Sequence, residues 1–129
     1  MARARASDMG NTGQEQGAAA VEFALVITLL MAILGGIVDF GFLFNAQISL
    51  THAAREGVRV EAIGTGDPVA AATAAFTAPA VTGFSASVTQ PCTTNGTSTT
   101  LTTTADYSFF FLPFNDRALS GEAVMRCGG

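Results

Sequence analysis

Few residues in this sequence belong to the types that carry acid–base, nucleophilic or metal chemistry. His52 is the only histidine, and the chain contains no GxSxG, GxGxxG or P-loop pattern. A metal site needs several nitrogen, sulfur or carboxylate ligands at suitable spacing, and a nucleophilic triad needs a base beside its serine. We interpret His52 as a solvated residue on a helix. The sequence therefore predicts no enzyme, no cofactor and no metal site.

The two cysteines, Cys92 and Cys127, allow a clearer chemical prediction. A partial metal site is disfavoured because there is no second cysteine pair and His52 lies in a distant segment. A disulfide is favoured, and it indicates an oxidising, extracytoplasmic location for the carboxyl-terminal half. Closing a loop of about 35 residues contributes roughly 3–4 kcal/mol in the chain-entropy treatment.

Two carboxylates enclose the most apolar part of the chain. Between Glu22 and Asp39 lie sixteen residues, Phe23 to Val38, without a charge. As a helix this stretch is about 24 Å long, which is shorter than the ~30 Å hydrocarbon layer of a bilayer. At least one of the two acids therefore lies at membrane depth, where acids are costly and usually functional. The alternative is that both acids flank a thinned, tilted span and have no role.

The composition excludes several classes of protein. The chain has 129 residues, enough for one domain, with 49% apolar residues, 12% charged residues and a net charge of −4. This balance argues against a disordered tail and an ordinary cytosolic domain. Six arginines and no lysine give no basic patch, so nucleic acid is not an expected partner. The composition favours a membrane or secreted protein.

The apolar run is predicted to be a retained anchor, and its orientation follows from the cysteines. A cleaved secretory signal is disfavoured because the run is preceded by 17 to 22 residues and no small-x-small site follows it directly. Arginine counting is close to a tie, with Arg3 and Arg5 on one side and Arg55 and Arg59 on the other. The expected disulfide places the amino terminus in the cytoplasm and the carboxyl-terminal domain outside.

The helix is expected to continue past the anchor, from about Ala18 to Ile63, a length of ~69 Å. Glycines at 64 and 66 then end it. A stripe of mostly small residues recurs at spacings of three and four: Leu43, Ala46, Leu50, Ala53, Gly57 and Val60. The stripe packs either on neighbouring copies or on the protein's own distal domain. Both contacts are possible at once if they involve different sides of the helix.

The distal region predicts a short helix and a small antiparallel sheet. Asp67-Pro68 is an N-cap followed by proline, so a helix is expected over 69–76. Three strands with period-2 alternation follow, and the threonine-rich stretch 93–104 is typical of an exposed or edge strand. The long helix should cover the apolar face of this sheet. In a plain meander the outer strands lie about 10 Å apart, so the disulfide requires converging strand ends or a different strand order. The expected inward residues are Phe84, Ala86 and Val88, then Leu101, Ala105, Tyr107, Phe109 and Phe111, then Leu119, Ala123 and Met125.

The start of the apolar run carries a recognisable motif. The stretch GAAAVEFAL (17–25) resembles the processing site of class III signal sequences in type IV pilin-like proteins. The longer string from Gly17 to Phe44, with NAQI (45–48) and AAREGVR (53–59), resembles the TadE-like family, minor pseudopilins of tight-adherence (Flp-type) pili. The carboxyl-terminal half is compatible with the family through its proline-containing loop and the strand SGEAVMRC (120–127). One departure is that Asp39 stands where many relatives have glutamate.

The resemblance implies a fold, a processing step and partners. The fold is α+β with a type IV pilin-like architecture: a cytoplasmic leader (1–17), a transmembrane helix (18–44), its extension (45–64) and an extracytoplasmic domain (65–129). A prepilin peptidase would cleave between Gly17 and Ala18. Glu22, together with Asp39, would then serve assembly, since Glu22 can pair with the Ala18 amine of a neighbour. The implied partners are this peptidase, other pilins or pseudopilins, the assembly machinery and the lipid bilayer.

Three other interpretations remain open at this point. A TadG-like or other pilus-associated relative would share the amino-terminal region. An unprocessed single-span anchor could display a small disulfide-closed binding domain. A secreted adhesive or structural domain would have lost the apolar run as a signal peptide. The last two would make Gly17 and Glu22 incidental.

Overall fold

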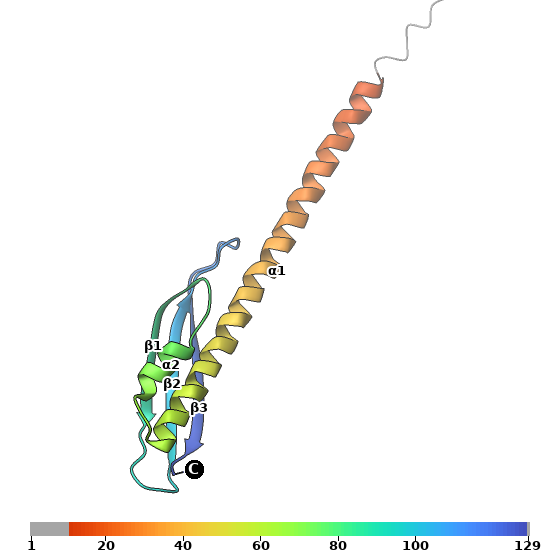
Figure 1. Ribbon diagram of the computed structural model, residues 1–129. Coiled ribbons are helices and arrows are strands. Elements are labelled where there is room, and N and C mark those ends of the chain that lie inside the picture. Colours follow the sequence, from red (N-terminus) through yellow and green to blue (C-terminus); the bar gives the residue numbers. More distant parts are fainter. Residues whose placement is uncertain (1–10, 129) are drawn as a thin grey trace, which may run out of the picture.

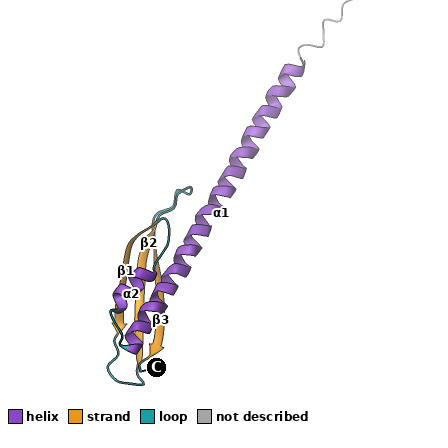
Figure 2. Ribbon diagram, in the orientation of Figure 1, coloured by secondary structure: helices purple, strands orange, loops and turns teal. Residues whose placement is uncertain are grey.

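The computed structural model describes residues 11–128 and has an α+β fold with a pilin-like layout (Figures 1 and 2). One long helix projects from a small domain in which a short helix and a three-stranded sheet pack against its carboxyl-terminal half. The fold class predicted from the sequence is confirmed. The elements are α1 (Asn11–Ile63), α2 (Pro68–Ala75), β1 (Val81–Gln90), β2 (Ser98–Tyr107) and β3 (Arg117–Arg126).

Helix α1 begins earlier than the sequence predicts. Residues 11–17, expected to precede the helix as part of the cytoplasmic leader, form its first turns, while Arg3, Arg5 and Asp8 lie outside the described residues. No proline interrupts this stretch, and glutamine and glutamate are good helix formers. Once a helix is nucleated, each further residue adds a hydrogen bond, so α1 extends to 53 residues, about 80 Å.

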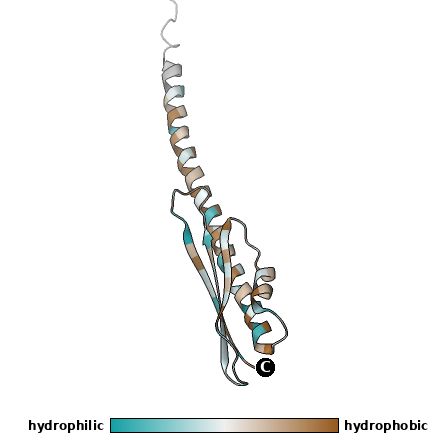
Figure 3. Cartoon of the chain, turned by 90° about the vertical axis from the view of Figure 1, so that its left-hand side faces the viewer, coloured by the Kyte–Doolittle hydropathy of each residue, from teal (hydrophilic) through white to brown (hydrophobic). Residues whose placement is uncertain are grey.

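The two halves of α1 have opposite environments. From residue 16 to 34 its side chains are almost all exposed, including large apolar ones such as Phe23 and Leu29, and this half projects alone (Figures 1 and 3). From Ala46 onward one face is buried against the sheet and α2, with Leu50 and Ala53 fully enclosed. The small-residue stripe therefore packs on the protein's own distal domain, as one of the two interpretations predicted.

Local signals end α1 and start α2 as expected. Gly64 has φ +71°, and its amide donates to the Val60 carbonyl at 2.9 Å. The Asp67 side chain then accepts hydrogen bonds from the amides of Val69 and Ala70, with Pro68 in the first turn. This cap reverses the chain so that α2 packs beside the last turns of α1.

The sheet is an antiparallel meander of order β1-β2-β3. Leu101 on β2 pairs with Val88 on β1 and Ala123 on β3, which places all three on the helix-facing side. The predicted inward alternation holds along β2, which ends at Tyr107, so Phe109 and Phe111 lie in the following loop. Met125 shares the parity of Ala123, yet it is 38% exposed near the open end of the sheet.

The threonine-rich segment provides the central strand, not an edge. Thr99 and Thr103 are fully buried beneath the helix. Their hydroxyls are satisfied, because Thr99 donates to the Gln90 carbonyl at 2.6 Å and Thr103 to the Leu50 carbonyl at 3.0 Å. A β-branched hydroxyl residue can thus occupy a core position when a backbone carbonyl lies within reach. Composition alone did not indicate that partner.

The predicted disulfide joins Cys92 and Cys127, and the meander accommodates it because the strand ends converge. After β1, the loop 91–97 crosses the open end of β2 and pairs with the chain after β3. The Cys127 amide donates to the Thr97 carbonyl at 2.8 Å, and the Gly96 amide to the Cys127 carbonyl at 3.0 Å. The two cysteine Cα atoms are therefore 5.7 Å apart.

Candidate functional site

The predicted processing residues lie on the free half of α1. Gly17, Ala18 and Glu22 are exposed, and a Cβ atom built on Gly17 would meet no heavy atom within 4 Å. The segment is accessible to another protein, as a cleavage site must be. Glu22 and Asp39 are seventeen residues apart, about 26 Å along the axis, so the structure does not bring the two acids together.

The Gly17–Ala18 peptide bond lies inside the helix. A peptidase that reads an extended backbone has to unwind this stretch first. Glycine within a helix is less favourable than alanine by about 1 kcal/mol, which lowers the free energy of local unwinding at this position.

Asp39 forms the most organised polar site in the described chain. Its side chain is fully buried, and its two carboxylate oxygens accept hydrogen bonds from three consecutive backbone amides. Oδ1 accepts from Phe110 at 3.0 Å, and Oδ2 accepts from Phe111 at 2.9 Å and Leu112 at 2.8 Å. Successive amides that converge in this way form an anion-binding concavity, and bonds to a charged acceptor are stronger than neutral ones.

A second bond ties the same turn of α1 to the sheet. The buried Tyr107 hydroxyl donates to the main-chain carbonyl of Asp39 at 2.9 Å. Burial, and secondarily the negative charge of Asp39, raises the pKa of Tyr107. The phenol therefore stays protonated and remains a donor at neutral pH. Asp39 thus fixes two segments beside the same turn of α1. One is the end of β2, through Tyr107, and the other is the loop 108–116, which joins β2 to β3.

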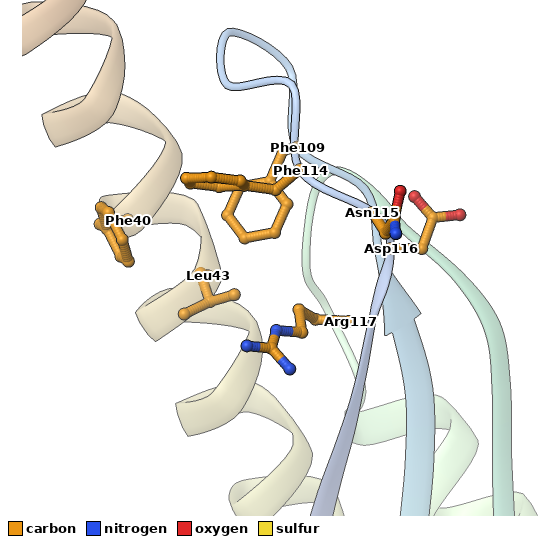
Figure 4. A pocket seen from close by; sticks show the side chains of 7 residues that line it. All are labelled: Phe40, Leu43, Phe109, Phe114, Asn115, Asp116 and Arg117. Carbon is orange, nitrogen blue, oxygen red and sulfur yellow. The ribbon is translucent and has the colours of Figure 1, made fainter.

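Aromatic rings fill the space beside this polar site. The Phe109 ring lies edge-on to Tyr107 at 5.2 Å, to Phe114 at 5.4 Å and to Phe40 at 6.5 Å between centroids. Below them a cavity of about 500 Å³ opens between α1 and the start of β3. In Figure 4 the rings of Phe109 and Phe114 and the guanidinium of Arg117 point toward α1.

Gly35 allows the loop to lie directly on the helix. A Cβ atom at Gly35 would lie 2.9 Å from the Phe111 Cβ, closer than such atoms approach. At the neighbouring Gly36 a Cβ would meet nothing within 4 Å. The absence of a side chain at position 35 is therefore needed for this contact.

The carboxylate of Asp39 is engaged within its own chain, which the sequence reasoning did not foresee. The resemblance grouped Asp39 with Glu22 for assembly and assigned no role to the proline-containing loop before the last strand. Two features of the sequence could have indicated this site: an acid, Asp39, within an apolar run, and the aromatic stretch 109–114 elsewhere in the chain. His52 is exposed, and within residues 11–128 no group of His, Cys, Asp or Glu is placed to hold a metal ion.

Comparison with known families gives one match. The family model described as TadE-like protein matches residues 17–59. This segment is TadE-like. The match begins at Gly17, includes Glu22 and Asp39, and ends within the part of α1 that packs on the sheet. No curated protein and no solved structure shows a significant match to the chain.

The TadE-like segment coincides with the part of α1 suited to a membrane. The helix is long and apolar enough to cross a bilayer. TadE-like proteins are in general single-span membrane proteins associated with Tad pili, and α1 has the length and apolar character that such a span requires. TadE-like pilus components are not enzymes in general.

Proposed function

We propose that the protein is a pseudopilin-like subunit that takes part in the assembly of tight-adherence (Flp-type) pili after processing by a prepilin peptidase. The observation that carries this proposal is the coincidence at Gly17. The TadE-like match starts at the glycine that the class III motif marks as the cleavage position, and this glycine is exposed on the free half of α1.

In this proposal each part of the chain has a distinct place. Residues 1–17 are a cytoplasmic leader, residues 18–44 span the membrane, residues 45–64 extend the helix and residues 65–129 form the extracytoplasmic domain. The Cys92–Cys127 disulfide supports this orientation, because such bonds persist in oxidising compartments.

Glu22 acts in assembly through charge pairing. Cleavage creates an ammonium group at Ala18, one helical turn from Glu22. In a multi-subunit assembly the Glu22 carboxylate of one subunit pairs with the Ala18 amine of its neighbour, which offsets the cost of burying either charge. The exposure of both residues in the single chain is compatible with such a contact.

Co-assembly measured with Glu22→Ala tests this function. We expect the variant to be cleaved and inserted normally, while its recovery with other pilins in the assembled fraction falls about tenfold, equivalent to losing roughly 1.4 kcal/mol of subunit contact. Glu56→Ala, which removes an acid from the sheet-packed half of the same helix, is the matched control and should assemble normally. Equal recovery of the two variants would contradict the pairing.

An unprocessed anchor is the alternative that this experiment also addresses. A plain anchor would show no assembled fraction for the wild type, and Glu22→Ala would have no measurable consequence. The terminus of the mature chain separates the two functions independently of assembly.

A further inference from the structure

The loop 108–116 lies at the depth of the apolar anchor, not beyond it. Phe111 contacts Gly35, which is thirteen residues, about 20 Å, past Glu22. If the hydrocarbon layer of ~30 Å begins near Glu22, Phe111 lies well within it. Figure 1 shows this loop rising from the sheet beside α1, toward the amino-terminal end of the helix.

The outward surface of the loop is strongly apolar. The stretch 109–114 reads FFFLPF and has no charge. Phe110 is 79% exposed, and Phe111 and Phe114 are more than half exposed. Three neighbouring exposed phenylalanines are unfavourable in water and mark a surface that contacts another apolar phase.

The amide hydrogens in the middle of the loop are bonded within the protein. The amides of residues 110, 111 and 112 all donate to Asp39, and residue 113 is proline and has no amide hydrogen. The amide of Phe114 donates to the Leu112 carbonyl at 2.8 Å. Among residues 110–114 no amide hydrogen lacks a partner in the protein, which removes part of the cost of placing irregular backbone at membrane depth.

The same bonds account for an acid in the apolar helix. Asp39 is shielded from its surroundings and faces three amide dipoles. These hydrogen bonds offset part of the cost of burying its charge. At the base of the loop, Asn115, Asp116 and Arg117 are exposed polar residues suited to the headgroup region.

We infer that the loop 108–116 is a second membrane element, whose Phe110 and Phe111 side chains enter the acyl chains of the leaflet nearest the sheet domain. The inference rests on the proposed membrane anchoring of α1. It assigns this surface to lipid because the surface continues the apolar anchor at the same depth. The sheet domain is thereby fixed against the bilayer at two points, the helix and the loop.

Single-tryptophan fluorescence tests this inference, because the natural chain contains no tryptophan. Three full-length variants are compared in vesicles that contain brominated phosphatidylcholine. Phe110→Trp reports on the loop, Leu29→Trp on the middle of the anchor and Val124→Trp on the outer face of β3. All three positions are exposed, so the substitutions should not disturb the fold.

We expect bromine to quench Phe110→Trp and Leu29→Trp at least about twofold, and to leave Val124→Trp near its unquenched intensity. Quenching of Leu29→Trp without quenching of Phe110→Trp would overturn the loop assignment and leave the anchor intact. No quenching at either position would overturn both.

A protein contact gives a different signature. If the loop packs on a second copy, Phe110→Trp emission is blue-shifted but insensitive to bromine, and the shift disappears when the protein is diluted in lipid. That result would overturn the assignment to lipid.

Discussion

Asp39 is the residue on which the junction between helix and loop depends. Asparagine has the same size but only one acceptor oxygen, and its amino group would face a backbone amide that also donates. We therefore expect Asp39→Asn to lower the unfolding midpoint in detergent by several degrees, since buried amides lose their partner. The loop should also become more susceptible to chymotrypsin near Phe110.

Asp116→Asn is the matched control for this prediction. Asp116 lies in the same loop but is exposed, so its replacement should change the midpoint and the digestion rate very little. Equal behaviour of the two variants would show that the three hydrogen bonds to Asp39 do not hold the loop.

At the level of elements, the contact between α1 and the sheet depends on a glycine. A Cβ atom at Gly121 on β3 would lie 2.8 Å from the Leu50 carbonyl carbon and 2.9 Å from the Thr103 hydroxyl. The Leu50 backbone can move away only at a cost in free energy. Gly121→Ala should therefore destabilise the domain by about 1–3 kcal/mol in chemical denaturation. Gly66→Ala, where the nearest atom is at 3.6 Å, should stay within about 0.5 kcal/mol of the wild type. If Gly121→Ala is as stable as the wild type, α1 and the sheet are packed less tightly than these distances indicate.

The elements themselves were largely predictable, because their signals are local. The cap at Asp67, the glycine at 64 and the alternation around Leu101 each depend on neighbours in the sequence. The burial of Thr103 and the bonds of Asp39 were not predictable, because their partners lie about fifty and seventy residues away along the chain. Such contacts follow from the assembled fold and cannot be read from local sequence patterns.

At the scale of the whole molecule, the disulfide closes the end of the domain farthest from the anchor. Intact-mass analysis with an alkylating reagent should show no free thiol before reduction and two after it. Reduction should lower the free energy of unfolding by about 3–4 kcal/mol, because the unfolded chain regains the freedom of a long loop. Two alkylated thiols in protein taken from the cell envelope would remove the argument for an extracytoplasmic domain.

The central claim is that the chain is processed as a pseudopilin, and terminal sequencing of the membrane fraction tests it most directly. We predict a mature terminus at Ala18 in cells with an active prepilin peptidase. Gly17→Leu should block the cut, while the control Gly36→Leu, at an open position further along the same helix, should leave it unchanged. A terminus beyond Val38 would indicate a secretory signal. A native terminus at Met1 or Ala2 in the same cells would contradict the assignment.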